Sequence, residues 1–326
     1  MEIWLKGGEN MNQRLKIYLL ILAALLTLSS LVSVPTLVAQ DPNLASANQG
    51  LNYLRNSQQE NGSITGFTGI SHWATIAFAS AGIKANDVEL EDGESLLRYI
   101  RSNPPGSSSP ATDWERAMLS LYATGKRARS YWGVRYLDNL EAKYNSNQIG
   151  DPSLVNDDIF GLLALIAAGS RADGEIKSNV LNFILAHQNP DGGFSWSTSF
   201  GSDSNDTAAA IQALIAARNS GLGSSGVNSA IEKAKDYLLT TQNPDGGFVY
   251  EIGSDSDTAS SSWAVLALSS LGLGNSAESE AAESYIRNRQ LPDGSFEWMS
   301  GFGGDTFTTS YAVTALSGKY WPIRFK

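Results

Sequence analysis

The stretch Gln188–Phe194 reads Q-N-P-D-G-G-F, and it decides the fold because it returns twice in almost the same form. It returns as Q-N-P-D-G-G-F at Gln242–Phe248, 54 residues later, and as Q-L-P-D-G-S-F at Gln290–Phe296, a further 48 residues along the chain. A period of this length is typical of one supersecondary unit that is copied and stacked. The sequence therefore predicts a repeat architecture.

Each copy follows a segment with the pattern of an amphipathic helix. Phe183, Tyr237 and Tyr285 lie five residues before the three glutamines, and apolar residues recur at helical spacing along 231–241. The same aromatic-aliphatic pattern occurs further upstream, once in degenerate form, which raises the number of units from three to six. The six units take their register from positions 53, 99, 139, 183, 237 and 285.

After each glutamine, the Asn-Pro-Asp-Gly composition indicates a tight turn, because Pro suits its second position and Gly tolerates a positive φ. We interpret this turn as purely structural. A polar loop then leads to a second helix, expected at 206–217, 257–271 and 305–316 in the last three units. These second helices are apolar or small nearly all round and should be buried, whereas the first helices carry charges on one side and should face solvent.

One buried and one exposed helix per unit, repeated six times, predict an all-α fold. We expect an (α/α)6 toroid over 40–326, in which six inner helices form a barrel and six outer helices wrap it. A closed ring needs no capping repeats, which an open solenoid would require.

The N-terminal segment has the layout of a targeting sequence. Residues 17–38 are almost uniformly apolar and follow two basic residues. They predict either a signal peptide cleaved after Ala39 or a retained membrane anchor, since the stretch is just long enough to span a bilayer. The sequence does not decide whether translation starts at Met1 or at Met11. In either case 40–326 is expected to be secreted or otherwise extracytoplasmic.

Composition narrows the chemistry further. The formal net charge is −10 and no basic run occurs, which argues against a nucleic-acid partner, whose phosphates require Lys and Arg. The chain of 326 residues has no Cys, so disulfides, thiolate nucleophiles and Cys-ligated metals are excluded. His72 and His187 are its only histidines. We therefore expect no metal and no cofactor.

The repeat turn after a Tyr-Leu helix resembles the repeat of the squalene/oxidosqualene cyclases and the protein prenyltransferase β-subunits. The resemblance covers all six units and is specific in the last three. It implies the α/α toroid, with a Gln and a terminal aromatic that tie neighbouring helices together. Phe194, Phe248 and Phe296 stand where the cyclase pattern prefers Trp. Other functions use the same toroid, so the fold alone does not fix the chemistry.

The catalytic groups that this resemblance implies are missing at the matched positions. A cyclase of this kind has D-x-D-D-T-A and protonates its substrate with the middle Asp, but Asp203–Ala208 reads D-S-N-D-T-A and places Asn205 there. An amide cannot serve as that acid. A prenyltransferase holds zinc with Asp, Cys and His, of which Asp257 alone is matched. Both chemistries are therefore expected to be lost.

Aspartates at the predicted starts of the inner helices remain as candidates. Such a residue can cap its helix by accepting a hydrogen bond from a free backbone N–H. Together, the carboxylates can instead form a ring at the barrel mouth that binds a ligand or a cation such as calcium. His72 is a candidate proton carrier, although a lone His is more often structural. The weak catalytic candidates are Asp157, Asp158, Asp206 and His72.

Aromatic residues accompany these carboxylates. Trp73, Trp263 and Tyr311 share one position in the repeat. At helical spacing such residues are typical of a core, but near the mouth of a toroid they would suit an apolar or sugar ligand. The candidate binding residues at the cavity rim are Trp73, Trp114, Asp203, Asn205, Asp206, Asp257, Trp263, Asp305, Phe307 and Tyr311.

We therefore hypothesise a non-catalytic extracytoplasmic domain that binds a small apolar or glycan ligand, or a protein partner, at the toroid mouth. Two enzymatic alternatives remain open: a divergent terpene cyclase that uses Asp157, Asp158 or Asp206 as its acid, and a glycan lyase or hydrolase with paired carboxylates. Carboxylates that face each other across the cavity at roughly 5–10 Å would favour glycoside chemistry. Aspartates bonded to their own helix N-termini would favour binding.

Overall fold

The structure, a computed structural model, describes residues 41–169, 172–223 and 225–325. The signal peptide or anchor expected within residues 1–39 lies outside the described residues. Among the helices that the structure describes, none is long and apolar enough to cross a membrane.

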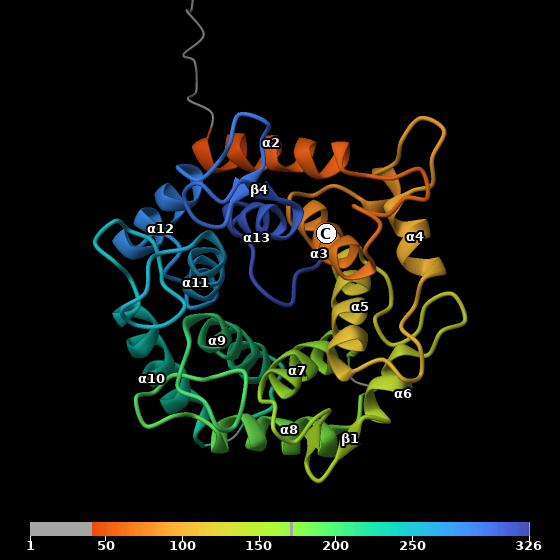
Figure 1. Cartoon of the computed structure of the whole chain (residues 1–326). Helices are drawn as coiled ribbons and strands as arrows, with labels where there is room; N and C mark the ends of the chain where they lie inside the picture. Colours follow the sequence, from red (N-terminus) through yellow and green to blue (C-terminus); the bar gives the residue numbers. More distant parts are fainter. Residues whose placement is uncertain (1–40, 170–171, 224, 326) are drawn as a thin grey trace, which may run out of the picture. The chain divides into compact units, whose positions relative to one another are not determined.

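Within these residues, twelve α-helices alternate between an outer and an inner layer (Figure 1). Each unit supplies one outer helix followed by one inner helix. The outer helices are α2 (Pro42–Asn56), α4 (Leu96–Ser102), α6 (Tyr136–Glu141), α8 (Gly174–Ala186), α10 (Val227–Thr240) and α12 (Ala277–Arg287). The inner helices are α3 (Thr68–Ser80), α5 (Ala111–Ala123), α7 (Asn156–Ala168), α9 (Ser204–Asn219), α11 (Thr258–Ser270) and α13 (Thr306–Leu316).

Short elements lie in the connections between these helices. β1 (Tyr144–Asn145) pairs antiparallel with β2 (Gln148–Ile149), and β3 (Phe296–Glu297) pairs antiparallel with β4 (Gly304–Asp305). A single turn of 3₁₀-helix, η2 (Ala85–Asp87), precedes α4. The facing residues are Tyr144 with Ile149, Asn145 with Gln148, Phe296 with Asp305, and Glu297 with Gly304.

Helix contacts close the inner layer into a ring. α3 packs against α5, the contacts continue through α7, α9 and α11 to α13, and α13 packs back against α3. The outer helix that follows each inner helix packs behind it, as α4 does behind α3, while α2 packs behind α13. Figure 1 shows this ring along its axis, with α2 outside α13. The predicted all-α toroid of six helix pairs is therefore confirmed.

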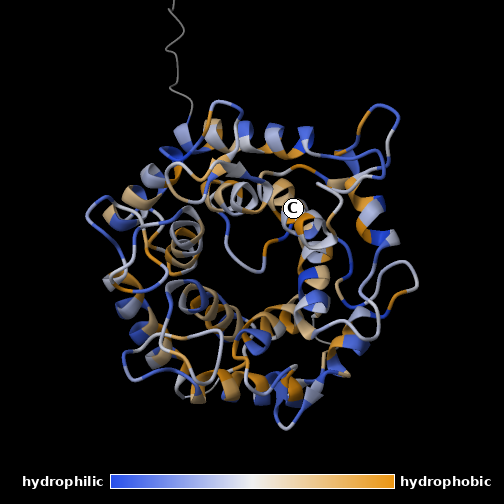
Figure 2. Cartoon of the chain, in the orientation of Figure 1, coloured by the Kyte–Doolittle hydropathy of each residue, from blue (hydrophilic) through white to orange (hydrophobic). Residues whose placement is uncertain are grey.

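The inner helices consist of small and apolar residues, which explains their burial. α11 reads T-A-S-S-S-W-A-V-L-A-L-S-S, and its buried hydroxyls are satisfied along the helix: Ser262 donates to the carbonyl O of Thr258 at 2.6 Å. α10, by contrast, buries one face and leaves Glu232 and Lys233 exposed. Figure 2 shows this difference as paler and orange inner helices and bluer outer rims. The predicted division into buried and exposed helices is confirmed.

The glutamine of each repeat turn joins that turn to the following outer helix or to the segment leading into it. Nε2 of Gln188 donates to the carbonyl O of Gly192 in its own turn and to that of Ala230 in α10, both at 2.8 Å. This is the tie between neighbouring helices that the family resemblance implies. Equivalent pairs of bonds are made by Gln58, Gln242 and Gln290.

At Gln290 this interaction closes the ring. Nε2 donates to the carbonyl O of Gly294 at 3.0 Å and to that of Ser46 in α2 at 2.9 Å, across 244 positions of the chain. The turn also approaches α2 closely: Gly294 has a φ of +89°, and a Cβ there would lie 2.4 Å from the carbonyl O of Gln49. Only glycine fits such a position. The last repeat turn thus holds α2, the outer helix of the first unit.

The aromatic residue that ends each turn fastens the turn to the inner helix of its own unit. The backbone N–H of Phe194 donates to Thr207 Oγ1 at 2.8 Å, and that of Phe248 donates to Ser261 Oγ at 2.9 Å. Both rings are fully buried. Phe therefore serves as the buried anchor at the position where the cyclase pattern prefers Trp.

The segment after α13 crosses the inside of the ring, which the repeat pattern does not predict. The N–H of Trp321 donates to Oε1 of Gln212 in α9 at 3.0 Å, and the N–H of Phe325 donates to the carbonyl O of Ala123 at the end of α5 at 2.7 Å. Figure 1 shows this segment looping from α13 into the ring. The Trp321 side chain is buried among the inner helices.

Replacing Gln290 with Ala should lower the free energy of unfolding by about 1–3 kcal/mol, because two hydrogen bonds worth about 0.5–1.5 kcal/mol each are lost. Urea unfolding followed by circular dichroism measures the change. Gln59→Ala is the matched control, since Gln59 directly follows a repeat glutamine but is exposed. Equal, small effects of the two substitutions would contradict the role of Gln290 in closing the ring.

Replacing Trp321 with Ala should lower the free energy of unfolding by about 3–5 kcal/mol, because truncating a large buried aromatic leaves a cavity. Trp132→Ala serves as the comparison, since Trp132 is 68% exposed and surface changes usually have small effects. The same unfolding measurement applies. If both substitutions were equally mild, the segment after α13 would not belong to the core.

Candidate functional site

Aromatic side chains from several elements meet inside the ring. The centroids of Trp73 in α3 and Tyr311 in α13 are 5.1 Å apart, and the ring of Trp263 in α11 lies 6.3 Å from Trp73 and 5.5 Å from Tyr311. Phe307 lies 4.6 Å from Tyr311. Trp321 joins them at 5.6 Å from Trp73. Four of the predicted rim aromatics therefore form one cluster, and the segment after α13 adds a fifth ring.

Trp114 lies apart from this cluster. Its buried ring is 5.8 Å from that of Tyr136 in α6, so it packs between the inner and outer layers. The repeat register gives the reason: Trp114 is the fourth residue of α5, as Thr207 and Ser261 are of their helices. That position faces the repeat turn and not the interior of the ring.

The same register identifies Arg116, which the sequence analysis missed. Trp73, Trp263 and Tyr311 are each the sixth residue of their helix, and Arg116 is the sixth residue of α5. Its guanidinium carbon lies 5.8 Å from the centre of the Trp73 ring. The inward position that holds an aromatic ring in three units thus holds a cation in the second unit.

A cavity of about 110 Å³ adjoins the aromatic cluster. Its apolar walls include Trp73, Phe160 and Trp321, and its polar wall includes Glu115 and Arg116. An engineered apolar cavity of about 150 Å³ in another protein holds benzene, so this smaller space suits a group of about five carbons.

Glu115 is a second candidate that the sequence analysis missed. Its side chain is fully buried in the cavity wall, and neither carboxyl oxygen has a hydrogen-bond partner among the described residues. Burial, and next the negative charges of Asp157 and Asp158, raise the pKa of Glu115 well above its ordinary value, although Arg116 opposes this rise. Its environment therefore favours the protonated, neutral form of the carboxyl group. The adjacent pair Glu115 and Arg116, directly after Trp114, is the sequence signal that could have revealed it.

Asp157 and Asp158 fix the β1–β2 hairpin to α7. Oδ1 of Asp158 accepts a bond from the N–H of Ile149 at 2.9 Å, and Oδ2 of Asp157 accepts one from the N–H of Asp151 at 3.0 Å. The expectation that they cap α7 is wrong, because the helix begins at Asn156 and both carboxyls lie within its first turn. Burial raises the pKa of Asp158 to about 8 and also raises that of Asp157.

Asp203 caps α9, which corrects the expectation that Asp206 opens this helix. Oδ1 of Asp203 accepts the N–H of Asp206 at 2.8 Å, so α9 begins at Ser204 and Asp206 lies in its first turn. Burial raises the pKa of Asp203 to about 6. Burial, and then the negative charge of Asp203, raise the pKa of Asp206 well above its ordinary value. Asn205 lies between these two acids, half-buried, and its Oδ1 accepts the Ser204 hydroxyl at 3.3 Å.

Asp257 and Asp305 cap their own helices, as expected. The carboxylate of Asp257 accepts the backbone N–H of Ser260 at 2.8 Å and its hydroxyl at 2.6 Å. Asp305 accepts the N–H groups of Phe307 and Thr308, each at 2.8 Å. Within the described residues, no group of three or more His, Asp or Glu side chains is arranged to hold a metal ion. These aspartates therefore act on their own helices.

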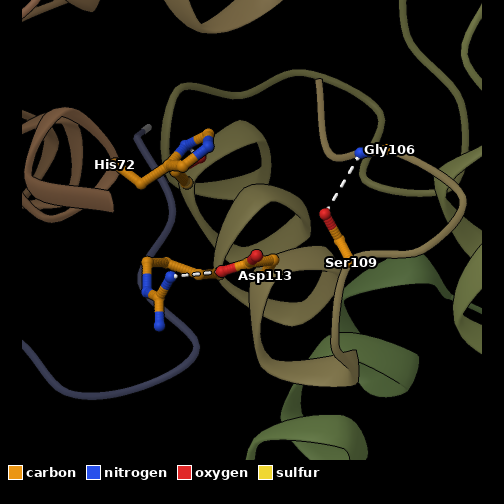
Figure 3. Close-up of polar contacts among 6 residues, drawn as sticks. His72, Gly106, Ser109 and Asp113 are labelled. Atoms are coloured by element: carbon orange, nitrogen blue, oxygen red, sulfur yellow. Dashed lines mark hydrogen bonds and ion pairs between the residues drawn. The ribbon is translucent and has the colours of Figure 1, made fainter. Parts of the chain in front are cut away.

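His72 is buried in α3 and is held through one ring nitrogen. Nδ1 lies 2.7 Å from the Ser120 hydroxyl of α5. Burial, and next the positive charge of Arg116, lower the pKa of His72 to about 3. The imidazole is therefore neutral at pH 7, which does not suit the predicted role as a proton carrier near that pH. Figure 3 shows the ring projecting from α3 toward the segment that carries Gly106 and Ser109.

The raised pKa of Asp158 predicts a pH-dependent stability. The folded protein holds a proton on this carboxyl that the unfolded chain releases above about pH 4, so the free energy of unfolding should fall as the pH rises from about 4 to 8. Asp158→Asn should reduce this fall, because the amide cannot ionise. Urea unfolding at pH 5 and pH 8 tests it, with exposed Asp92→Asn as the control. An unchanged pH dependence in Asp158→Asn would contradict a protonated Asp158.

Comparison with known proteins agrees with this architecture. Residues 125–318 match the prenyltransferase alpha-alpha toroid domain. A drimenyl diphosphate synthase from Streptantibioticus cattleyicolor is 32% identical over 180 residues, which cover 49% of this chain and 33% of that protein. The chain thus spans about a third of the length of this curated relative.

Solved structures share the toroid at low sequence identity. The type II terpene cyclase MstE from Scytonema, in complex with merosterolic acid A, has a TM-score of 0.60 and 15% identity over 86% of this chain and 99% of that one. A family 88 glycosyl hydrolase from Bacteroides vulgatus has a TM-score of 0.61 and 9% identity over 84% and 98% of the two chains. These likenesses concern the fold, and the domain match covers more than half of the chain. The chain therefore belongs to the prenyltransferase alpha-alpha toroid domain family.

Proposed function

We propose that this terpene cyclase-like toroid is a binding domain that holds an apolar ligand of the isoprenoid class in its central cavity. The observation that carries the proposal is the cavity lining, in which Trp73, Phe160 and Trp321 surround a space suited to about one five-carbon unit. Aromatic walls are typical of sites for apolar ligands. The likeness to a drimenyl diphosphate synthase and to a terpene cyclase supports the isoprenoid class.

The proposal does not include the acid-initiated cyclisation of terpene cyclases. Asn205 stands at the position of the acid, and an amide is no proton donor for an alkene. Asp203, Asp257 and Asp305 are bonded to their own helix N-termini, which favours binding over chemistry at a pair of carboxylates. The glycan alternative therefore ranks below the apolar ligand.

Geraniol, an isoprenoid alcohol of two five-carbon units, is a suitable probe, because one unit matches the cavity and the rest of the molecule can extend beyond it. We expect saturable binding in a one-to-one ratio with a Kd of about 0.1 mM, which corresponds to about 0.5 kcal/mol per non-hydrogen atom. Calorimetric titration measures it. Leu119→Phe should weaken binding at least ten-fold, because Leu119 lines the cavity and the larger ring fills it.

Leu44→Phe is the control for that titration, since Leu44 is exposed on α2. Circular dichroism establishes that both variants are folded. If geraniol failed to bind the wild-type protein, or bound Leu119→Phe as well as wild type, the central cavity would not be the ligand site.

Proton donation by Glu115 is a second candidate function. The favouring observation is a fully buried carboxyl group in the cavity wall, with a pKa raised well above its ordinary value by burial. Transfer of its proton to an alkene carbon would leave a carbocation beside the faces of Trp73 and Phe160, which stabilise positive charge. Return of a different proton to the carboxylate would complete an isomerisation. Because a raised pKa makes Glu115 a weaker acid, binding remains the first proposal.

The Glu115→Gln variant separates the two functions. If the protein only binds, geraniol incubated with it is recovered unchanged, as gas chromatography with mass spectrometry would show. If Glu115 donates a proton, isomers accumulate with the wild-type protein and not with Glu115→Gln, while the two proteins bind geraniol with similar Kd values. Equal turnover by both proteins would exclude Glu115 as the acid.

We also propose an extracytoplasmic location, which the apolar stretch at 17–38 supports. Fractionation of the native host would find the protein outside the cytoplasm or in the membrane fraction. Removal of residues 1–39 should retain it in the cytoplasm, and an unchanged distribution would contradict the proposal.

A further inference from the structure

A second pocket, of about 370 Å³, lies next to the aromatic cavity and is polar. Its walls come from the start of α3, from the segment that links α4 to α5, and from α5 itself (Figure 3). Arg116 lines both spaces, so one side chain forms the boundary between the apolar cavity and the polar pocket. The polar groups of this pocket include Thr68, His72, Asn103, Ser109, Asp113 and Arg116.

The hydrogen bonds of His72 define what it offers to this pocket. The Ser120 hydroxyl donates to the carbonyl O of Ala117 at 2.9 Å, so its oxygen lone pair accepts the N–H of His72 Nδ1 at 2.7 Å. This assigns the hydrogen of the neutral imidazole to Nδ1 and leaves a lone pair on Nε2. The side chain is 3% exposed, and Nε2 has no partner among the described residues. A buried acceptor without a hydrogen-bond donor raises the free energy of the folded protein, and a ligand that donates a hydrogen bond would remove this penalty.

Arg116 offers the complementary group. One Nη1–H of Arg116 is bonded to Oδ1 of Asp113 at 3.0 Å, whereas its buried Nε–H has no partner within the described part of the chain. The guanidinium and the His72 imidazole belong to residues that line the same pocket, and the positive charge lowers the pKa of His72. The two residues that carry this buried acceptor and this charged group therefore line the same pocket.

We propose that this pocket binds the hydroxyl group of an isoprenoid alcohol whose apolar end lies in the aromatic cavity. The ligand hydroxyl donates to Nε2 of His72 and accepts from the guanidinium of Arg116. This inference rests on the proposed function, which supplies the apolar end of the ligand. A hydroxyl is both donor and acceptor, and it therefore satisfies both groups.

An anionic head group fits the pocket less well. An ionised phosphate or carboxylate has no hydrogen to donate to the Nε2 lone pair. The carboxylate of Asp113 already forms an ion pair with Arg116, and its negative charge repels a second anion. With a pKa of about 3, His72 stays neutral from pH 5 to pH 9 and does not become a second cation. Titration of His72 should therefore not alter the binding of the alcohol over this range.

The test compares geraniol with geranyl methyl ether, which has the same carbon chain but no hydroxyl hydrogen. The wild-type protein should bind geraniol at least ten-fold more tightly, because the ether leaves Nε2 unpaired. His72→Asn keeps an N–H donor near the Nδ1 position but has no atom at Nε2. In this variant the ratio of the two Kd values should fall to about one, with the affinity for the ether unchanged.

Two further variants make the outcome specific. His72→Gln places an amide oxygen near the Nε2 position and should restore part of the preference for geraniol. His187→Asn is the control and should leave the ratio unchanged, since His187 ends the outer helix α8 and bonds to the carbonyl O of Phe183.

Each result decides between the two proposals. If neither ligand binds the wild-type protein, the proposed function fails and this inference fails with it. If both bind equally, the cavity binds its apolar ligand but the hydroxyl site is wrong. Equal losses of both ligands in His72→Asn would give His72 a structural role only and overturn the inference. Tighter binding of geranyl diphosphate than of geraniol would identify an anion site instead.

Discussion

The structure depends on the side-chain amide of the repeat glutamine. In each copy, this amide donates two hydrogen bonds to backbone carbonyl groups. One bond stabilises the turn that follows the glutamine, and the other holds the next outer helix or the segment leading into it. In the last unit the second bond goes to Ser46 in α2, the outer helix of the first unit. The same contact that spaces the units along the chain therefore also makes the array a ring, and a ring has an interior that side chains or a ligand must fill.

The interior of the ring brings apolar aromatic side chains and ionisable side chains into the same wall. Aromatic rings from α3, α7, α11 and α13 supply an apolar environment, and Trp321 enters it from outside the repeat pattern. The second unit inserts Glu115 and Arg116 into the same wall. Burial of a carboxylate is unfavourable, and the nearby negative charges increase the cost, so the pKa of Glu115 is raised well above its ordinary value. Unpartnered polar atoms beside an apolar cavity are what an amphiphilic ligand would satisfy.

Much of the site could be predicted where it follows the repeat. Trp73, Trp263 and Tyr311 occupy one register position, and the structure brings their rings together. Register counting from the helix starts would also have placed Trp114 outside the cluster, had the start of α5 been known. The starts of the helices were predicted least well. A capping side chain fixes a helix start through a hydrogen bond, and the hydrophobic pattern of the sequence does not show that bond. Asp203, for example, caps α9, so this helix begins at Ser204.

The sequence by itself determined the toroid and the division into inner and outer helices, and through the resemblance it predicted that Asn205 stands in place of a catalytic acid. These follow from periodicity, hydrophobic patterning and a matched motif, all of which are local or repeated. Only the tertiary structure decided the rest: that Trp321 lies inside the ring, that burial raises the pKa of Glu115, and that Nε2 of His72 has no partner within the described part of the chain. Each depends on groups brought together from distant helices, and desolvation in such an enclosed space exists only after the ring has closed.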